Sequence, residues 1–253
     1  MGQQWRQTEM QTREPEQITV SLQGHPGLWK APRSSIHLVT AENRHLYRES
    51  LEASFRLRHH VYVTERGWET FRSPDGREID VYDTHDAIYL LVIEENDDRL
   101  VGCARLLPTA RVTPLKEFPG LSGVYDFPRS PSVYHFSRCV VASDRRGGQA
   151  INTLITLIRI GVQEFCLSEN IEQLTILLPV ALLPAYLELG WNPQPLGLPL
   201  TWCGVSCVVV MLDVSEVALT QTRAICGITD PLLVRHGITR PIISPAPVFN
   251  HLC

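Results

Sequence analysis

Residues 133–167 decide the fold, and they read V-Y-H-F-S-R-C-V-V-A-S-D-R-R-G-G-Q-A-I-N-T-L-I-T-L-I-R-I-G-V-Q-E-F-C-L. The first part, residues 133–142, is rich in β-branched and aromatic residues and predicts a strand. Residues 149–167 form a long apolar segment that predicts a buried helix. The D-R-R-G-G turn between them places the helix N-terminus directly after the strand. Backbone N–H groups at such a junction form an anion site that suits a pyrophosphate.

Strands and helices surround this junction in an order that can be taken from the pattern. Residues 35–40 predict a first strand, and an amphipathic helical region follows towards residue 63. Residues 87–95 and 99–107 predict a hairpin. Residues 172–178 and 204–212 predict two further strands, each followed by a helix, at about residues 181–190 and 214–226. This order indicates an α/β or α+β three-layer domain. It resembles the GNAT acyltransferase fold, which implies a mixed central sheet flanked by helices.

Composition and charge limit the class of protein further. A chain of 253 residues with 44% hydrophobic content can bury one core. A net charge of -4 does not indicate a nucleic-acid surface. The most apolar run carries polar and charged residues, which favours a buried helix over a membrane span. The chain opens without a basic and apolar leader, so we expect a cytoplasmic protein. Its seven cysteines form no C-x-x-C pair, so we expect buried thiols and no metal site.

The domain boundaries follow from the two ends of the chain. Residues 1–34 are polar and without periodicity, and we expect a mobile extension there. Residues 35–227 hold all the predicted elements and form the catalytic domain. Residues 228–253 contain several prolines, and we expect a poorly structured tail.

Residues 58–83 carry the chemistry, in the stretch R-H-H-V-Y-V-T-E-R-G-W-E-T-F-R-S-P-D-G-R-E-I-D-V-Y-D. Arg58, Tyr62 and Trp68 come first, and a Pro-Asp-Gly turn then leads to three acids spaced E-x-D-x-x-D, namely Glu78, Asp80 and Asp83. Two arginines follow later, Arg105 in G-C-A-R-L-L-P-T and Arg138 in H-F-S-R. Such a cluster is costly to bury without internal pairing, and a loop this long is usually functional. A salt-bridge network that only pins the loop to the sheet is the alternative.

Taken in order, these motifs resemble those of the acyl-homoserine-lactone synthases, the autoinducer synthases of bacterial quorum sensing. The resemblance covers about residues 35–211 and rests on R-x3-aromatic-x5-W, E-x-D-x-x-D, G-x-x-R-L-L-P-T and S-R. It implies a GNAT-like fold and two substrates, S-adenosylmethionine and an acyl thioester of CoA or acyl-carrier protein, with no cofactor. The family acylates the α-amine of S-adenosylmethionine and then closes the lactone with release of methylthioadenosine.

The resemblance also implies which residues perform the chemistry. Carboxylates suit the ammonium, an arginine fork suits the carboxylate, and aromatic faces suit the sulfonium or adenine. The implied catalytic residues are His135, Glu78 and Arg138. The implied substrate-binding residues are Arg58, Tyr62, Trp68, Asp80, Asp83, Arg105, Phe136 and Ser137. The acyl thioester is expected at Arg145, Arg146, Gly147 and Gly148, with the acyl chain in a cleft between residues 133–141 and 173–178.

Two positions depart from the family pattern. His135 stands where the family usually has a glutamate, and an imidazole with a pKa of about 6.5 suits general base catalysis. We therefore expect His135 to act as the base, with activity rising through its own pKa; a strand histidine with a backbone partner is the alternative. Cys139 replaces a common aromatic, which either reshapes a pocket or adds a core thiol. His135 leaves two other functions open: a GNAT-type acyltransferase for another amine, and a non-catalytic relative that binds an adenosyl or acyl ligand.

Overall fold

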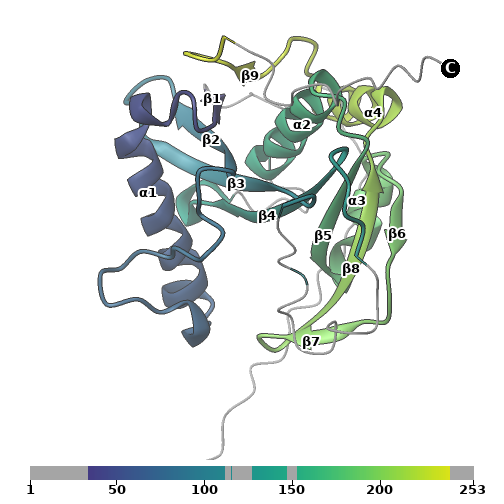
Figure 1. Cartoon of the computed structure of the whole chain (residues 1–253), viewed down its shortest axis with the longest axis horizontal. Helices are drawn as coiled ribbons and strands as arrows, with labels where there is room; N and C mark the ends of the chain where they lie inside the picture. Colours follow the sequence, from purple (N-terminus) through teal and green to yellow (C-terminus); the bar gives the residue numbers. More distant parts are fainter. Residues whose placement is uncertain (1–33, 112–114, 116–126, 147–152, 240–253) are drawn as a thin grey trace, which may run out of the picture.

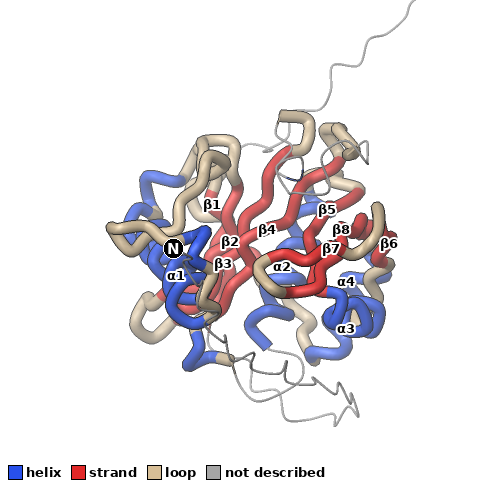
Figure 2. The backbone as a smooth tube through the Cα atoms, turned by 90° about the horizontal axis from the view of Figure 1, so that it is seen from below, coloured by secondary structure: helices blue, strands red, loops and turns tan. Residues whose placement is uncertain are grey.

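The computed structural model describes residues 34–111, 115, 127–146 and 153–239. The described strands form one mixed sheet in the order β6-β8-β5-β4-β3-β2-β1-β9, and β7 pairs with β8 outside this path (Figures 1 and 2). The strands are β1 Ser34–Val39, β2 Ile88–Glu94, β3 Leu100–Pro108, β4 Val133–Val141, β5 Gln173–Pro179, β6 Pro193–Pro195, β7 Leu200–Trp202, β8 Val205–Asp213 and β9 Leu233–Val234.

Helices lie on both faces of the sheet, with α1 on one side and α2 and α4 on the other (Figure 1). The α-helices are α1 Arg48–His59, α2 Thr153–Ser168, α3 Leu183–Glu188 and α4 Glu216–Cys226. Shorter helical turns are Arg44–Leu46, His60–Glu65, Glu69–Phe71, Ser143–Arg145 and Val180–Leu182. The prediction of a three-layer domain with a mixed sheet is confirmed. None of the helices in the described ranges is both long and apolar enough to span a bilayer.

The alternation of side chains along β2 explains the two layers of core. Tyr89 and Leu91 point towards α1, whereas Leu90 and Val92 point towards α2. Side chains alternate between the two faces of a strand, so a strand covered on both sides is apolar throughout. Gly161 lets α2 approach the sheet closely, because an added Cβ would stand 3.0 Å from Cδ1 of Ile36. One sheet is therefore buried between two helical layers.

β4 and β5 separate part of the way along their length, and this divergence positions the site. Their parallel pairing runs only from Val133↔Gln173 to His135↔Thr175. Beyond these residues, β4 continues to pair with β3 and β5 with β8. The position of His135 is therefore the last point at which the two central strands are joined. The acyl cleft expected between residues 133–141 and 173–178 stays a prediction.

The expectation of a poorly structured tail from residue 228 is wrong for residues 228–239. β9 pairs in parallel with β1 and is the last strand at that end of the sheet. The carboxylate of Glu164 in α2 accepts hydrogen bonds from the backbone N–H groups of Leu232 and Leu233 at 3.0–3.1 Å. Arg235 pairs with Glu169 at 2.9 Å. Isolated apolar residues between prolines gave no strand signal, and the pairing became visible only with the edge of β1 in place.

Candidate active site

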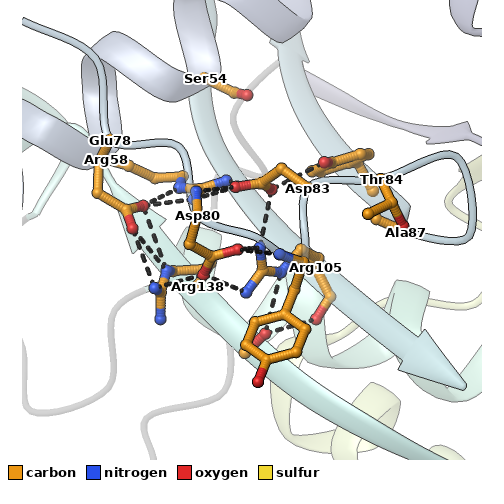
Figure 3. A network of polar contacts seen from close by, with 12 residues as sticks. Ser54, Arg58, Glu78, Asp80, Asp83, Thr84, Ala87, Arg105 and Arg138 are labelled. Atoms are coloured by element: carbon orange, nitrogen blue, oxygen red, sulfur yellow. Dashed lines mark hydrogen bonds and ion pairs between the residues drawn. The ribbon is translucent and has the colours of Figure 1, made fainter. Parts of the chain in front are cut away.

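Three arginines and three acids from separate elements meet on the α1 face of the sheet (Figure 3). Arg58 comes from the end of α1, Arg105 from β3 and Arg138 from β4, while the acids come from the loop before β2. We call these six residues, Arg58, Glu78, Asp80, Asp83, Arg105 and Arg138, the charged network. The sequence predicted all six, and the structure brings them together.

In the buried part of the charged network, Arg58 and Arg105 are hydrogen-bonded to carboxylates. Arg58 donates two hydrogen bonds to Asp83, at 2.9 and 2.8 Å, and also bonds to Glu78. Arg105 donates two to Asp80, at 2.6 and 2.8 Å, and lies 2.8 Å from Asp83. Paired arginine–carboxylate bonds of this kind fix geometry as well as charge. Buried charges are tolerated here because each has an opposite partner.

Asp80 and Arg138 form the open edge of the charged network. Arg138 binds Glu78 at 3.0 Å and Asp80 at 2.6 Å. The side chains of Arg138 and Asp80 are 17% and 21% exposed, whereas those of the other four members are 1% to 3% exposed. Asp80 and Arg138 are therefore the members of the charged network that solvent reaches.

Local hydrogen bonds fold the acid loop into its shape. The Pro-Asp-Gly turn is present, closed by a bond from Gly76 N–H to the carbonyl of Ser73 at 3.2 Å. Further on, Asp83 accepts from the backbone N–H of Asp80 at 2.9 Å, and Asp80 accepts from that of Tyr82 at 2.8 Å. Aspartate side chains that cap their own loop in this way hold the turn in one conformation. The E-x-D-x-x-D spacing thus builds the loop and aims its acids.

A bulge in β4 turns Arg138 towards the acids. Arg105 pairs with Ser137 and Cys103 with Val140, so two β4 residues stand opposite one residue of β3. Arg138 has a φ of 56°, in the left-handed region that non-glycine residues rarely adopt. A bulge re-aims a side chain, and strain of this kind persists where the surroundings fix it. Here the pairing with Glu78 and Asp80 supplies that fixation.

The charged network shifts the pKa of its acids. Burial alone would raise the pKa of Asp80, but the hydrogen bond and charge of Arg105, with the charge of Arg138, hold it below its usual range. The pKa of Asp83 is lowered in the same way, against burial, mainly by the hydrogen bond and charge of Arg58. Both acids are therefore ionised at neutral pH.

An aromatic group lies beside Arg138. Tyr62 and Trp68 stack with ring centroids 5.4 Å apart and an interplanar angle of 9°. Phe71 contacts both rings, and the guanidinium of Arg138 lies 5.0 Å from its centroid. Arg66 lies 5.0 Å from the Trp68 centroid and 5.7 Å from that of Tyr62. The predicted aromatic pair is present, and its surface already accepts a positive charge.

His135 lies at the last paired position of β4 and β5, on the same strand face as Ser137. It is buried and shares a hydrogen bond between Nδ1 and Oγ1 of Thr175 at 3.1 Å. Burial, with the charges of Arg105 and Arg138, lowers the pKa of His135 to about 3. The sequence left the direction of this shift open, and the arginines outweigh the acids. His135 is therefore neutral through the whole physiological range.

Other predicted residues fall in different places. The Ser137 hydroxyl lies 3.4 Å from Nε of Arg105 and so joins the charged network. Phe136 points the other way, into the core beneath α2, because neighbouring strand residues face opposite sides. Arg145 pairs with Glu94 at 2.7 Å, and Arg146 bonds to Glu65 at 2.6 Å. Gly147 and Gly148 lie outside the described residues.

Three residues of the site were not predicted. Phe71 completes the aromatic group, Tyr89 donates a hydrogen bond to Asp83 at 2.8 Å, and Thr175 holds His135. Phe71 follows Trp68 within the polar loop, where an aromatic residue could have been noticed. Tyr89 and Thr175 lie in apolar strands and carried no signal. No group of three or more potential metal ligands occurs among the residues that the structure describes.

A mixed sheet flanked by helices, with two central parallel strands that pair over only part of their length, defines a GNAT-like fold. The acyl-CoA N-acyltransferase of Pseudomonas aeruginosa has a similar fold, with a TM-score of 0.51 at 16% identity, over 70% of this chain and 98% of that chain.

Similarity to proteins of known activity then gives the family. The sequence pattern of the family described as autoinducer synthase matches residues 42–222. The isovaleryl-homoserine lactone synthase of Bradyrhizobium diazoefficiens is 46% identical over 165 residues, 65% of this chain and 73% of that protein. The solved structure of the CoA-dependent acyl-homoserine lactone synthase BjaI, with SAM and isopentyl-CoA, has a TM-score of 0.75 and 37% identity, over 82% of this chain and 96% of that chain. This chain belongs to the autoinducer synthases and is an acyltransferase.

Proposed function

We propose that this protein is an acyl-homoserine-lactone synthase that takes its acyl group from CoA. The observation that carries the proposal is the open edge of the charged network, where Asp80 and Arg138 lie beside the aromatic group and near the divergence of β4 and β5. The similarity to the CoA-dependent synthase and to the isovaleryl-homoserine lactone synthase supports CoA as the carrier.

S-adenosylmethionine matches the open edge group by group. Its ammonium suits the ionised Asp80, and its carboxylate suits the guanidinium of Arg138. Its sulfonium or adenine suits the partly exposed face of Trp68, where Arg66 already shows that a cation is accepted. The four buried members of the network hold Asp80 and Arg138 in place, and contacts held in advance lose little on binding.

In the first step, the α-amine attacks the thioester carbonyl and the CoA thiol leaves. The amine must be deprotonated, and it must be held against the carbonyl at the divergence of the strands. His135, with its pKa of about 3, holds no proton at neutral pH. We assign it a positioning role, as a neutral hydrogen-bonding group near the carbonyl, and the amine proton passes to water at the open edge. In the second step the carboxylate displaces the sulfonium, which closes the lactone and releases methylthioadenosine.

The pyrophosphate of CoA is assigned to the segment from Arg145 onward. Both described arginines there are bonded to acids of the protein, Arg145 to Glu94 and Arg146 to Glu65. Each is at least one third exposed, so a phosphate can compete for it in water.

The test is methylthioadenosine release by the purified protein with S-adenosylmethionine and isovaleryl-CoA, with mass spectrometry of the lactone. We expect both products and free CoA in equal amounts. Free CoA without methylthioadenosine would indicate an N-acyltransferase for another amine. Binding of S-adenosylmethionine without any product from a CoA or carrier-protein thioester would indicate a non-catalytic relative.

A further inference from the structure

A second polar group lies in the core on the opposite face of the sheet, under α2. Arg159 is 6% exposed, and its Nε has no hydrogen-bond partner among the described residues. Gln163 is fully buried, and neither amide atom has a partner in the same part of the chain. Trp191 is 2% exposed with its indole N–H equally unpaired. Buried polar groups are normally hydrogen-bonded, so three in one region call for a cause.

Arg159 and Trp191 both pack against Tyr186. The guanidinium of Arg159 lies 4.3 Å from the centroid of the Tyr186 ring, and Trp191 packs edge-on at 5.9 Å. Arg159 and Gln163 are four residues apart and so share one side of α2. We call Arg159, Gln163, Tyr186 and Trp191 the Arg159 cluster.

No acid in the described chain forms an ion pair with Arg159, and two acids that follow it in the chain are paired with other arginines. Glu164 pairs with Arg223 at 2.8 Å, and Glu169, just after α2, pairs with Arg235 at 2.9 Å. A buried charge without a partner is costly, and only the Tyr186 ring and hydroxyl oppose that cost here. The cluster is therefore complete only when something else supplies an acceptor.

The Arg159 cluster lies next to the divergence of β4 and β5. Cys139 packs against the same core cluster as Tyr186 and Trp191. Burial raises the pKa of the Cys139 thiol to about 11, and the charge of Arg159 opposes the rise. Cys139 is on β4, four residues beyond His135 where the strands part. Tyr186 belongs to α3, which follows β5. Arg159 therefore lies near residues of both diverging strands: Cys139 on β4 itself, and Tyr186 on the helix that follows β5.

We propose that the Arg159 cluster is the far end of the acyl site and selects acyl groups that carry an acceptor oxygen. This inference rests on the proposed function. An acyl chain that enters between β4 and β5 from the thioester would bring its distal end towards Arg159. A carboxylate, hydroxyl or carbonyl there would accept from Nε of Arg159 and from the indole of Trp191. A plain hydrocarbon chain would leave these donors unpaired, and a site built to bond an oxygen rejects the analogue that lacks it.

The experiment compares pairs of CoA thioesters that differ in one oxygen-bearing group. Octanoyl-CoA is paired with the suberoyl thioester, which adds a terminal carboxylate, and phenylpropionyl-CoA with its para-hydroxy derivative, which adds a neutral oxygen. We expect kcat/KM for methylthioadenosine release to favour the oxygenated member of at least one pair by ~10-fold or more, the size of one good hydrogen bond. The pair that shows the preference tells whether the oxygen is anionic or neutral.

Arg159→Met should abolish this preference while turnover of the plain thioesters is kept or improved. Arg159→Lys, which keeps the charge but not the fork, should retain part of the preference even if Arg159→Met does not fold. Arg235→Met removes an arginine outside the cluster and should leave the ratio unchanged.

Preference for the plain member in both pairs overturns the inference. A preference that survives Arg159→Met also overturns it. The same holds if the Arg159→Met protein melts several degrees lower and its turnover of all the thioesters falls equally. Turnover of plain thioesters alone leaves the proposed function standing. If no thioester gives methylthioadenosine, both the proposed function and this inference are wrong.

Discussion

The buried arginines on the two faces of the sheet differ in whether they have carboxylate partners. On the α1 face, Arg58, Arg105 and Arg138 are each matched by a carboxylate, so the charged network is complete within the chain. On the α2 face, Arg159 has an aromatic neighbour and no acid in the described residues. A complete network holds its shape before any substrate arrives, whereas an incomplete one gains stability from a ligand. A complete network suits the positioning of a substrate, and an incomplete one suits selection among acyl groups.

The largest effect should come from unbalancing the charged network. Glu78→Leu removes one of three negative charges and leaves Arg58 and Arg138 short of a partner. We expect the free energy of unfolding to fall by about 3–5 kcal/mol, the usual cost of breaking a buried pair. Urea denaturation measures it.

Two variants sharpen this comparison. Glu69→Leu breaks an exposed pair with Arg72 and should leave stability unchanged within error. Arg159→Met removes an unpaired buried charge, so its unfolding free energy should equal or exceed that of the parent. A Glu78→Leu protein as stable as the parent would show that the six residues are not one balanced unit.

The next effect is on turnover. Asp80→Asn keeps the volume of the side chain and removes the charge at the open edge. We expect kcat/KM for methylthioadenosine release to fall at least ~100-fold, as for loss of a preorganised electrostatic contact, with the fold retained. Asp75→Asn, in the exposed turn of the same loop, is the matched control and should turn over normally. Full activity of the Asp80 variant would remove the loop from the substrate site.

A smaller effect concerns pH. The unfolded chain protonates His135 near its ordinary pKa of about 6.5, whereas the folded protein does so only near 3. Between these values the unfolded state binds one more proton, so stability falls as the pH is lowered, by up to about 1.4 kcal/mol per pH unit. Denaturation curves at several pH values should show this limb in the parent and a shallower one in His135→Gln, where His37, whose pKa is also lowered by burial, remains.

The same pKa predicts an activity profile without a histidine limb. Methylthioadenosine release from about pH 5.5 to 8.5 should keep its shape in His135→Gln, although its level can drop through lost positioning. An acidic limb near neutrality that vanishes in this variant would restore His135 as the general base.

The smallest effect is expected from removal of residues 1–33, which carry no core pattern in the sequence. Turnover should stay close to that of the full chain. Removal of residues 228–253 is the contrasting truncation. It takes away β9 and the backbone donors to Glu164, so the melting temperature should fall. Loss of activity with retained folding after the first truncation would contradict the domain boundary.

Three features could not be derived from the sequence, and the cause was the same in each case. The direction of the His135 pKa shift depends first on burial and then on the charges of Arg105 and Arg138, which come from different strands. Phe136 belongs to the same H-F-S-R motif as Ser137, yet the side chains of β4 alternate, so the two residues face opposite sides of the sheet. β9 is two residues long and exists only because the edge of β1 is there to pair with.

The sequence by itself determined the order of the longer strands and the helices, the acid loop and the identity of all six members of the charged network, but not the short strands β6, β7 and β9. It could do so because periodicity, turn residues and charged spacing are local properties of the chain. Only the tertiary structure decided which charges are satisfied. Arg138 reaches the acids through a bulge, whereas Arg159 lies over the ring of Tyr186 and pairs with no acid of the described residues. Charge pairing depends on distances between elements far apart in sequence, and those distances are set by the packing of the two faces.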